Sequence, residues 1–348
     1  MAKRILEVKN LVTTFFTHLG EVQAVRDISF NLDEGDILGI VGESGSGKSV
    51  TSLSIMGLVD DPGRVVSGSI KFEDVDLTKL SDRDLNKYRG NEISMIFQDP
   101  MTSINPVFSI GNQLIEVIRA HTDMNHQEAK ERAIELLKMV GIPEPESRIK
   151  NFPHQFSGGM RQRAMIAMAM SCNPKLLIAD EPTTALDVTI QAQILDLMRD
   201  LKDKTSATII LITHDLGVIA EICNKVIVMY GGKIMEKADI FSLYEQPQHP
   251  YTIGLMQSVP KPKKGSRDRL VPIPGSPPDL LAPPKGCPFS PRCPHAMGIC
   301  LEEESPLFKI SDTQAAACWL HHENAPEVKG FIKSKVIINE ETEVNSHE

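Results

Sequence analysis

The chain has 348 residues, of which 41% are hydrophobic and 24% charged, a composition typical of a globular protein long enough for two domains. Its net charge of −9 argues against a nucleic-acid backbone as the main partner, because that binding needs a basic surface. The longest strongly apolar runs, at 37–42 and 207–213, are far shorter than the roughly 20 residues of a membrane-spanning helix, and the N-terminus has no signal-peptide pattern. We therefore expect a cytoplasmic location and no transmembrane segment.

The first part of the chain has short stretches in which apolar and polar residues alternate. Between Ile5 and about Ser29 apolar and polar residues alternate, which predicts antiparallel strands. The apolar segment 36–42 then predicts a buried strand, and residues 49–59 have helical spacing up to breakers near Pro62. The expected order is strand, glycine-rich loop and helix.

Helical patterns dominate the next part of the chain. Two long segments between about 110 and 140 have helical spacing, and the second is amphipathic and stops at Gly141. From Gly158 onward, helices alternate with apolar strands. This alternation predicts a parallel sheet covered on both faces, interrupted by a helical insertion.

Composition changes sharply after the last apolar strand. Fourteen of the 23 prolines lie between Pro247 and Pro306, so we place a domain boundary near residue 246. The expected divisions are a domain at 1–246 with a helical subdomain at about 99–172, a smaller region at 247–325, and a mobile acidic tail at 326–348.

The segment GESGSGKS fits the phosphate-loop pattern. Its glycines let backbone amides wrap a phosphate, and the following helix adds the partial positive charge of its N-terminus. Lys48 is expected to pair with the β- and γ-phosphates of ATP, and the Ser49 hydroxyl to bind Mg²⁺. The expected ATP contacts in this loop are Gly42, Glu43, Ser44, Gly45, Ser46, Gly47, Lys48, Ser49 and Val50.

The segment LLIADEP at 176–182 places two carboxylates at the end of an apolar strand. Asp180 suits Mg²⁺, held directly or through water. Glu181 is expected to accept a proton from, or to orient, the water that attacks the γ-phosphate.

The segment FSGGMRQR at 156–163 places a serine and two glycines where a helix begins. Ser157, Gly158 and Gly159 would present a hydroxyl and backbone amides to an anion. With the preceding motifs in this order, the segment closely resembles the signature sequence of ABC-transporter ATPases. The resemblance implies an α/β P-loop ATPase with an N-terminal antiparallel β-subdomain and a helical insertion subdomain.

In that family the signature loop serves the nucleotide of the opposite subunit. The resemblance therefore implies two ATP molecules between two such domains, with Ser157, Gly158, Gly159 and Asp187 acting in trans. Gln98 in IFQDP resembles the glutamine that contacts Mg²⁺ and the attacking water, and His214 in LITHD resembles the histidine that grips the γ-phosphate. The implied catalytic residues are Glu181, His214, Gln98 and Lys48, and the implied Mg²⁺ ligands are Ser49, Gln98 and Asp180.

Adenine needs a flat apolar partner, which the family places before the second strand. Phe15 is our choice for this role and Phe16 the alternative. Either residue could instead belong to the core.

Four cysteines cluster near the C-terminus, with gaps of five, six and seventeen residues between them. A cytoplasmic protein is not expected to form disulfides, so metal ligation is the favoured interpretation. Zinc sites usually pair cysteines two to four residues apart, and the wider gaps here favour an iron–sulfur cluster. Zinc and packed free thiols remain alternatives, and Cys172 and Cys223 are expected to be packed free thiols. The four candidate ligands are Cys287, Cys293, Cys300 and Cys318.

The segments 249–260, 273–293 and 315–322 resemble the C-terminal extension of oligopeptide and dipeptide permease ATPases. Some members of that family carry a [4Fe-4S] cluster on such cysteines, which is what the resemblance implies here. A cluster would staple a small, proline-rich segment whose own apolar burial is too limited to fold it.

The resemblance covers residues from about 5 to 325 and implies an ATP-hydrolysing subunit that energises peptide import, peripheral at the cytoplasmic face of the membrane. Implied partners are a second ATPase subunit, two transmembrane permease subunits and, indirectly, an extracytoplasmic solute-binding protein, but no nucleic acid. We expect a heterodimer with a paralogue, although a homodimer is possible in isolation. Nickel or another small solute is the alternative cargo. A non-transport ABC ATPase and a redox-regulated ATPase are less favoured.

Overall fold

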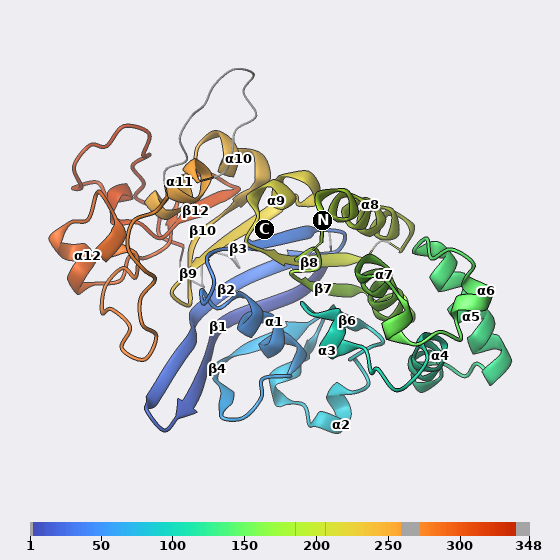
Figure 1. Cartoon of the computed structure of the whole chain (residues 1–348). Coiled ribbons are helices and arrows are strands. Elements are labelled where there is room, and N and C mark those ends of the chain that lie inside the picture. The colour runs from blue at the N-terminus through green and yellow to red at the C-terminus, as the bar shows by residue number, and fades with distance from the viewer. Residues whose placement is uncertain (1–2, 185, 206, 259–271, 339–348) are drawn as a thin grey trace, which may run out of the picture.

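Two β-sheets organise the described part of the chain. The computed structural model describes residues 3–184, 186–205, 207–258 and 272–338. Figure 1 shows the N-terminal strands in blue beside a larger sheet, with one group of helices at its far side and the C-terminal segment at the opposite side.

The N-terminal sheet is antiparallel, as the alternating pattern predicts. Leu6 and Val8 of its first strand are fully buried, whereas Glu7 between them is half-buried, so one face of the strand packs in the core. In spatial order the strands are β2 (Gly20–Asp33), β1 (Arg4–Thr17), β4 (Gly63–Phe72) and β5 (Val75–Asp76).

The larger sheet has a parallel centre and an antiparallel edge. The three inner strands of its parallel part are buried along their whole length, which explains their continuous apolar sequence. The parallel strands are, in spatial order, β6 (Ile93–Ile96), β7 (Leu176–Asp180), β8 (Thr208–Thr213), β3 (Ile37–Val41) and β9 (Lys225–Tyr230). The antiparallel strands β10 (Lys233–Asp239), β12 (Gln314–Ala316) and β11 (Phe308–Lys309) follow.

The helical insertion follows β6 and lies away from the N-terminal sheet, at the right of Figure 1. Its longest helix begins where the Asn125 side chain accepts from the Glu128 amide and the Glu128 carboxylate accepts from the Asn125 amide. The insertion comprises α3 (Pro100–Ser103), α4 (Ile110–His121), α5 (His126–Met139), α6 (Pro145–Arg148), η2 (Pro153–Gln155) and α7 (Gly158–Ala169).

The remaining helices connect strands or belong to the C-terminal part. Before the insertion lie α1 (Lys48–Met56), η1 (Leu77–Lys79) and α2 (Asp82–Leu85). After it come α8 (Val188–Thr205), α9 (Leu216–Ile222), α10 (Ile240–Glu245), α11 (Pro250–Gln257), η3 (Ser290–Arg292), α12 (Gly298–Glu302) and η4 (Trp319–His321). None of the helices within the described ranges combines the length and apolar character needed to cross a membrane.

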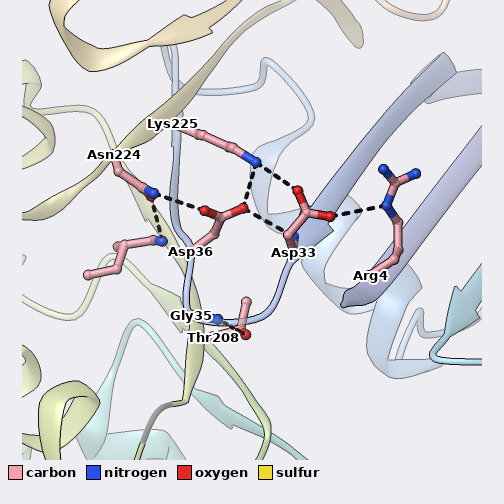
Figure 2. Close-up of polar contacts among 8 residues, drawn as sticks. Arg4, Asp33, Gly35, Asp36, Thr208, Asn224 and Lys225 are labelled. Atoms are coloured by element: carbon pink, nitrogen blue, oxygen red, sulfur yellow. Dashed lines mark hydrogen bonds and ion pairs between the residues drawn. The ribbon is translucent and has the colours of Figure 1, made fainter. Parts of the chain in front are cut away.

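A polar network fastens the N-terminal sheet to the start of β3 (Figure 2). The Lys225 ammonium lies 2.6 Å from one Asp36 oxygen and 3.1 Å from one Asp33 oxygen. Arg4 donates to the other oxygen of Asp33 at 3.2 Å, and the Asn224 amide donates to Asp36 at 2.9 Å. These contacts hold the turn between β2 and β3, and so fix where β3 enters the larger sheet.

The C-terminal extension shares its core with the ATPase body. Phe289 is 2% exposed and packs against Tyr230 and Tyr251, with ring centroids 5.4 and 5.3 Å away. Ala315 and Ala316 of β12 pair with β10, so the extension also continues the larger sheet. We expected a poorly cored segment, but the side chain of Phe289 packs in a core that the extension shares with the body.

Part of the expected mobile tail is held against the extension. Lys333 donates to the carbonyl oxygens of Ala325 and Leu320 at 2.7 and 3.0 Å, and Ile337 bridges to Phe308. Residues 339–348 lie outside the described part of the chain.

Candidate functional site

Four predicted motifs meet at one edge of the larger sheet. The phosphate loop follows β3, Asp180 ends β7, His214 follows β8 and Gln98 lies just beyond β6. Because these strands are parallel and adjacent, their carboxyl ends share one edge, where open α/β sheets bind ligands.

The phosphate loop needs glycine immediately before α1. Gly47 has φ 99°, in the left-handed region, and a Cβ there would lie 2.5 Å from the Ala24 carbonyl oxygen. The helix N-terminus therefore follows directly on a tight turn, with its first amides turned toward the loop.

Lys48 lies inside the loop and is 6% exposed. Its ammonium donates to the carbonyl oxygens of Gly42 and Glu43 at 2.7 and 2.9 Å. Burial lowers the pKa of Lys48, against the raising effect of Glu181 and Asp180. The site thus contains a desolvated cation that suits a phosphate anion.

Ser49 and Asp180 form an oxygen pair beside Lys48. The Ser49 hydroxyl donates to an Asp180 oxygen at 3.1 Å, and Asp180 is 5% exposed. Burial raises the pKa of Asp180, because the charged form loses water, and the Ser49 hydrogen bond opposes that effect. A hydroxyl and a carboxylate at this distance are the donors that Mg²⁺ prefers.

Glu181 is the centre of a second polar cluster. Its Oε2 accepts from the Gln98 amide at 3.0 Å and from the Thr184 hydroxyl at 2.7 Å, while Oε1 lies 3.3 Å from His214 Nδ1. The φ of Glu181 is 46°, which is unusual for a residue other than glycine. This backbone conformation is held by a hydrogen bond from the Glu181 amide to the Ile212 carbonyl oxygen. The predicted catalytic residues Gln98, Glu181 and His214 are therefore in contact.

The pKa of Glu181 is lowered. Burial alone would raise it, but hydrogen bonds from Thr184 and His214 and the charges of His214 and Lys48 outweigh that effect. The carboxylate is therefore ionised at neutral pH and accepts hydrogen bonds, as a group that orients water must.

The predicted signature loop lies apart from this cluster. The Ser157 hydroxyl caps α7 by accepting from the Met160 amide, and a Cβ on Gly158 would meet nothing within 4 Å. Across the described ranges, no hydrogen bond or ion pair joins this loop to the phosphate loop. Asp187 is exposed and caps α8, accepting from the amides of Thr189 and Ile190. Ser157, Gly158 and Asp187 are all exposed to solvent.

The two candidate adenine partners lie side by side on β1. Phe15 is half-buried against Gly63, where a Cβ would lie 2.5 Å from its ring. The Phe16 ring lies under the Arg64 guanidinium, 4.4 Å from ring centroid to carbon. Neither contact decides between them, so Phe15 stays a prediction.

The four C-terminal cysteines line one small cavity, together with His249, His295 and Trp319. Burial raises the pKa of the Cys287 thiol to about 11 and, with the neighbouring thiols, also raises that of Cys318. In the described part of the chain, no three His, Cys, Asp or Glu side chains are arranged to hold a single metal ion. The predicted grouping of Cys287, Cys293, Cys300 and Cys318 is thus present, whereas a ready-made metal centre is not.

Three residues with a place in this site do not belong to the predicted set. Thr184 holds Glu181, while Tyr251 and Arg292 contact the phosphate loop from the C-terminal extension. Thr184 lies three residues after Glu181, so its closeness to Glu181 could have been predicted from the sequence. The other two come from distant segments, and no local pattern signals their approach.

Family models match two parts of the chain. The model described as ABC transporter matches residues 25–184, and the model described as oligopeptide/dipeptide transporter, C-terminal region, matches residues 235–300.

Two relatives match most of the chain. The Oligopeptide transport ATP-binding protein OppD of Bacillus subtilis is 55% identical over 94% of this chain and 91% of its own length. The OppD protein of Salmonella typhimurium is 53% identical over 91% of this chain and 94% of its own.

Solved structures show the same fold. A dimeric structure of MJ0796, a bacterial ABC transporter cassette, is 28% identical with a TM-score of 0.62, covering 68% of this chain and 99% of that one. A dimeric post-hydrolysis state of MJ0796 bound to ADP and Pi is similar to the same extent.

Proposed function

Because the chain belongs to the ABC transporter ATP-binding proteins of the oligopeptide/dipeptide type, we propose that it hydrolyses ATP to drive peptide import through a membrane permease. The observation that carries the proposal is the meeting of Lys48, Asp180 and Glu181 at one sheet edge, within a chain that is 55% identical to an oligopeptide transport ATP-binding protein. Nickel or another small solute is the alternative cargo.

The proposed ATP site uses the phosphate loop, with its amides and Lys48 around the phosphates. Mg²⁺ fits beside it, with Ser49 and Asp180 as oxygen donors and Gln98 as a further ligand. When bound, the ion neutralises phosphate charge. Phe15 is the proposed partner of adenine.

Glu181 acts on the water that attacks the γ-phosphate. Its ionised carboxylate accepts a hydrogen bond from that water and takes its proton as the new phosphorus–oxygen bond forms and the bond to ADP breaks. Hydrogen bonds from Gln98 and Thr184 orient the carboxylate, and His214, which contacts the same carboxylate, is the proposed contact of the γ-phosphate. Lys48 stabilises the charge on the transferred group.

The second half of each ATP site comes from another subunit. Ser157, Gly158, Gly159 and Asp187 face outward, which supports a role at the nucleotide of the opposite ATPase. The similar solved structure of the MJ0796 cassette is dimeric. We propose a paralogue as the partner, giving a heterodimer.

The membrane partners are two permease subunits, and an extracytoplasmic binding protein delivers the cargo to them. Apolar side chains just after Gln98 are exposed, with Met101 at 61%, Val107 at 69% and Phe108 at 50%. Exposed apolar side chains of this kind suit contact with a short helix of a membrane subunit. We propose that the chain lies at the cytoplasmic face of the membrane, where it would contact these subunits.

We further propose that the four C-terminal cysteines hold a [4Fe-4S] cluster, with zinc as the alternative. Four thiols around one cavity are the ligands that such a cluster uses. The proposed divisions are an ATPase domain at 1–246, with its helical subdomain at about 99–172, and an extension at 247–325.

Iron and sulfide analysis of anaerobically purified protein tests the cluster. Replacement of Cys318 by serine should remove visible absorbance and iron, whereas Cys172→Ser, outside the cavity, should retain both. Stoichiometric zinc without iron would contradict the cluster.

Replacement of Glu181 by glutamine tests the hydrolytic role. ATP binding should remain, but turnover should fall by about 100-fold or more, because the base that takes the proton is lost. Glu221→Gln, an exposed carboxylate on α9, is the control and should leave the rate unchanged. Normal turnover by Glu181→Gln would refute the assignment.

A further inference from the structure

Among the described residues, the hydrogen bonds from the C-terminal extension to the phosphate loop all end at Glu43. The Glu43 amide donates to the Tyr251 hydroxyl at 2.8 Å. Its carboxylate accepts from both terminal nitrogens of Arg292, at 2.6 and 3.1 Å. Its carbonyl oxygen accepts from Lys48 at 2.9 Å. The amide, the carboxylate and the carbonyl of Glu43 therefore each have a partner: Tyr251 and Arg292 lie in the extension, and Lys48 begins α1.

Arg292 is built into its position. Its side chain is 5% exposed, and it also donates to the Tyr230 hydroxyl at 3.0 Å and to the carbonyl oxygens of Pro274 and Ile273. The Glu43 hydrogen bond raises its pKa further above the ordinary value. A planar guanidinium with two parallel bonds to a carboxylate fixes both position and orientation.

Tyr251 is equally fixed. It is fully buried on α11, with its ring against Tyr230 at 4.5 Å and Phe289 at 5.3 Å between centroids. Its hydroxyl has the Glu43 amide as its partner, so the ring packing sets where that amide lies. The aromatic group acts as a rigid support under the first turn of the loop.

We infer that Tyr251 and Arg292 are positioning residues for the phosphate loop, which hold Glu43 so that Lys48 and the loop amides are preorganised for the phosphates of ATP. The ATPase site would then depend on the extension, which completes it from outside the ATPase domain. Neither residue belongs to the expected ATP contacts, and both act through Glu43. The inference rests on the proposed ATPase function and names a support for that same site.

The geometry predicts a specific kinetic signature. Without either support the loop has more conformations to lose on binding ATP, so affinity should fall. A group that holds the loop equally in the ground and transition states changes KM and leaves kcat nearly constant. A merely structural role would instead lower the amount of folded protein, and so reduce kcat at an unchanged KM.

The test uses Tyr251→Phe and Glu43→Gln in the full chain assembled with its transporter partners. The phenylalanine keeps the buried ring and removes the hydroxyl, and the glutamine keeps the shape and removes the charge. Binding of a fluorescent ATP analogue and steady-state hydrolysis give Kd, KM and kcat. We expect Kd and KM to rise about tenfold, with kcat changed less than twofold.

Two further variants sharpen the result. Arg292→Lys keeps the charge but loses the two paired hydrogen bonds to Glu43. The double variant Arg292→Lys with Glu43→Gln should raise KM no more than either single change, because both changes remove the same contact. Glu304→Gln is the matched control, since Glu304 joins the extension to Arg26 and Lys233, away from the phosphate loop. The control should leave KM within twofold.

The outcomes separate the inference from the proposed function. If the wild-type chain does not bind the ATP analogue, the proposed function fails. If the wild type binds it and Tyr251→Phe and Glu43→Gln bind it equally well, the positioning role is overturned. An equal rise of KM in Glu304→Gln would also overturn it, because general attachment of the extension would then explain the effect.

Discussion

Truncation of Phe289 to alanine should uncouple the extension from the ATPase body. The side chain is 2% exposed and lies among Tyr230 and Tyr251 of the body and α11, with centroids 5.4 and 5.3 Å away. Removal of a buried phenyl ring costs about 4 kcal/mol, from lost apolar transfer and the cavity left behind. That is a large share of the 5–15 kcal/mol or so that stabilises a typical domain.

The single tryptophan of the chain makes the effect measurable. Trp319 lies in the extension, half-buried beside Phe308, with its ring nitrogen donating to the Glu303 carbonyl. Its fluorescence therefore reports on the extension, whereas far-ultraviolet circular dichroism reports on the whole chain. In wild-type protein the two urea transitions should coincide, since the core is shared.

In Phe289→Ala the fluorescence transition should move to lower urea, ahead of the circular dichroism transition, by an amount equivalent to about 4 kcal/mol. Phe241→Ala is the matched control, because Phe241 is 77% exposed, and it should change stability by less than about 0.5 kcal/mol. A shift below about 1 kcal/mol for Phe289→Ala, or one equal to that of the control, would refute the shared core.

Two further predictions concern charged groups. Burial alone would raise the pKa of Asp33, but Lys225 and Arg4 outweigh that effect and lower the pKa. The contribution of Asp33 to stability is therefore complete above its ordinary pKa of about 4, and it is lost as pH falls through the lowered pKa. In Asp33→Asn the free energy of unfolding should therefore depend less on pH between about pH 5 and 2. The difference from wild type should be about 1 kcal/mol or less, because water screens Lys225. Urea titrations that give the same pH dependence for both proteins would contradict this. Thr184→Val removes a hydrogen bond that lowers the pKa of Glu181, so the acid limb of the pH profile of kcat should move to higher pH. Thr184→Ser keeps a hydroxyl and should restore the wild-type profile. Identical profiles for Thr184→Val and wild type would contradict the role of Thr184.

The sequence was most informative where function resides in contiguous motifs. The phosphate loop, the carboxylates after β7 and the strand pattern around them are local signals, and the parallel order of β6, β7, β8 and β3 brings their ends together. The contact of Gln98, Glu181 and His214 follows from that topology.

Long-range contacts could not be predicted in the same way. Tyr251 and Arg292 lie 208 and 249 positions from Glu43, and only the folded arrangement of the extension brings them to the phosphate loop. The strand β12 has three residues, too few for a periodic pattern, so its addition to the sheet was also invisible. The buried Phe289 looked like part of a weak, proline-rich segment because the residues that bury it lie elsewhere in the chain.

The most direct test of the central claim is ATP-dependent uptake of a labelled oligopeptide by proteoliposomes that contain the assembled transporter. Wild-type protein should accumulate peptide only when ATP is supplied on the side of this subunit, and Glu181→Gln should bind ATP but stop uptake. Peptide uptake at the wild-type rate by Glu181→Gln, or no ATP-dependent peptide uptake by the wild type, would contradict the account.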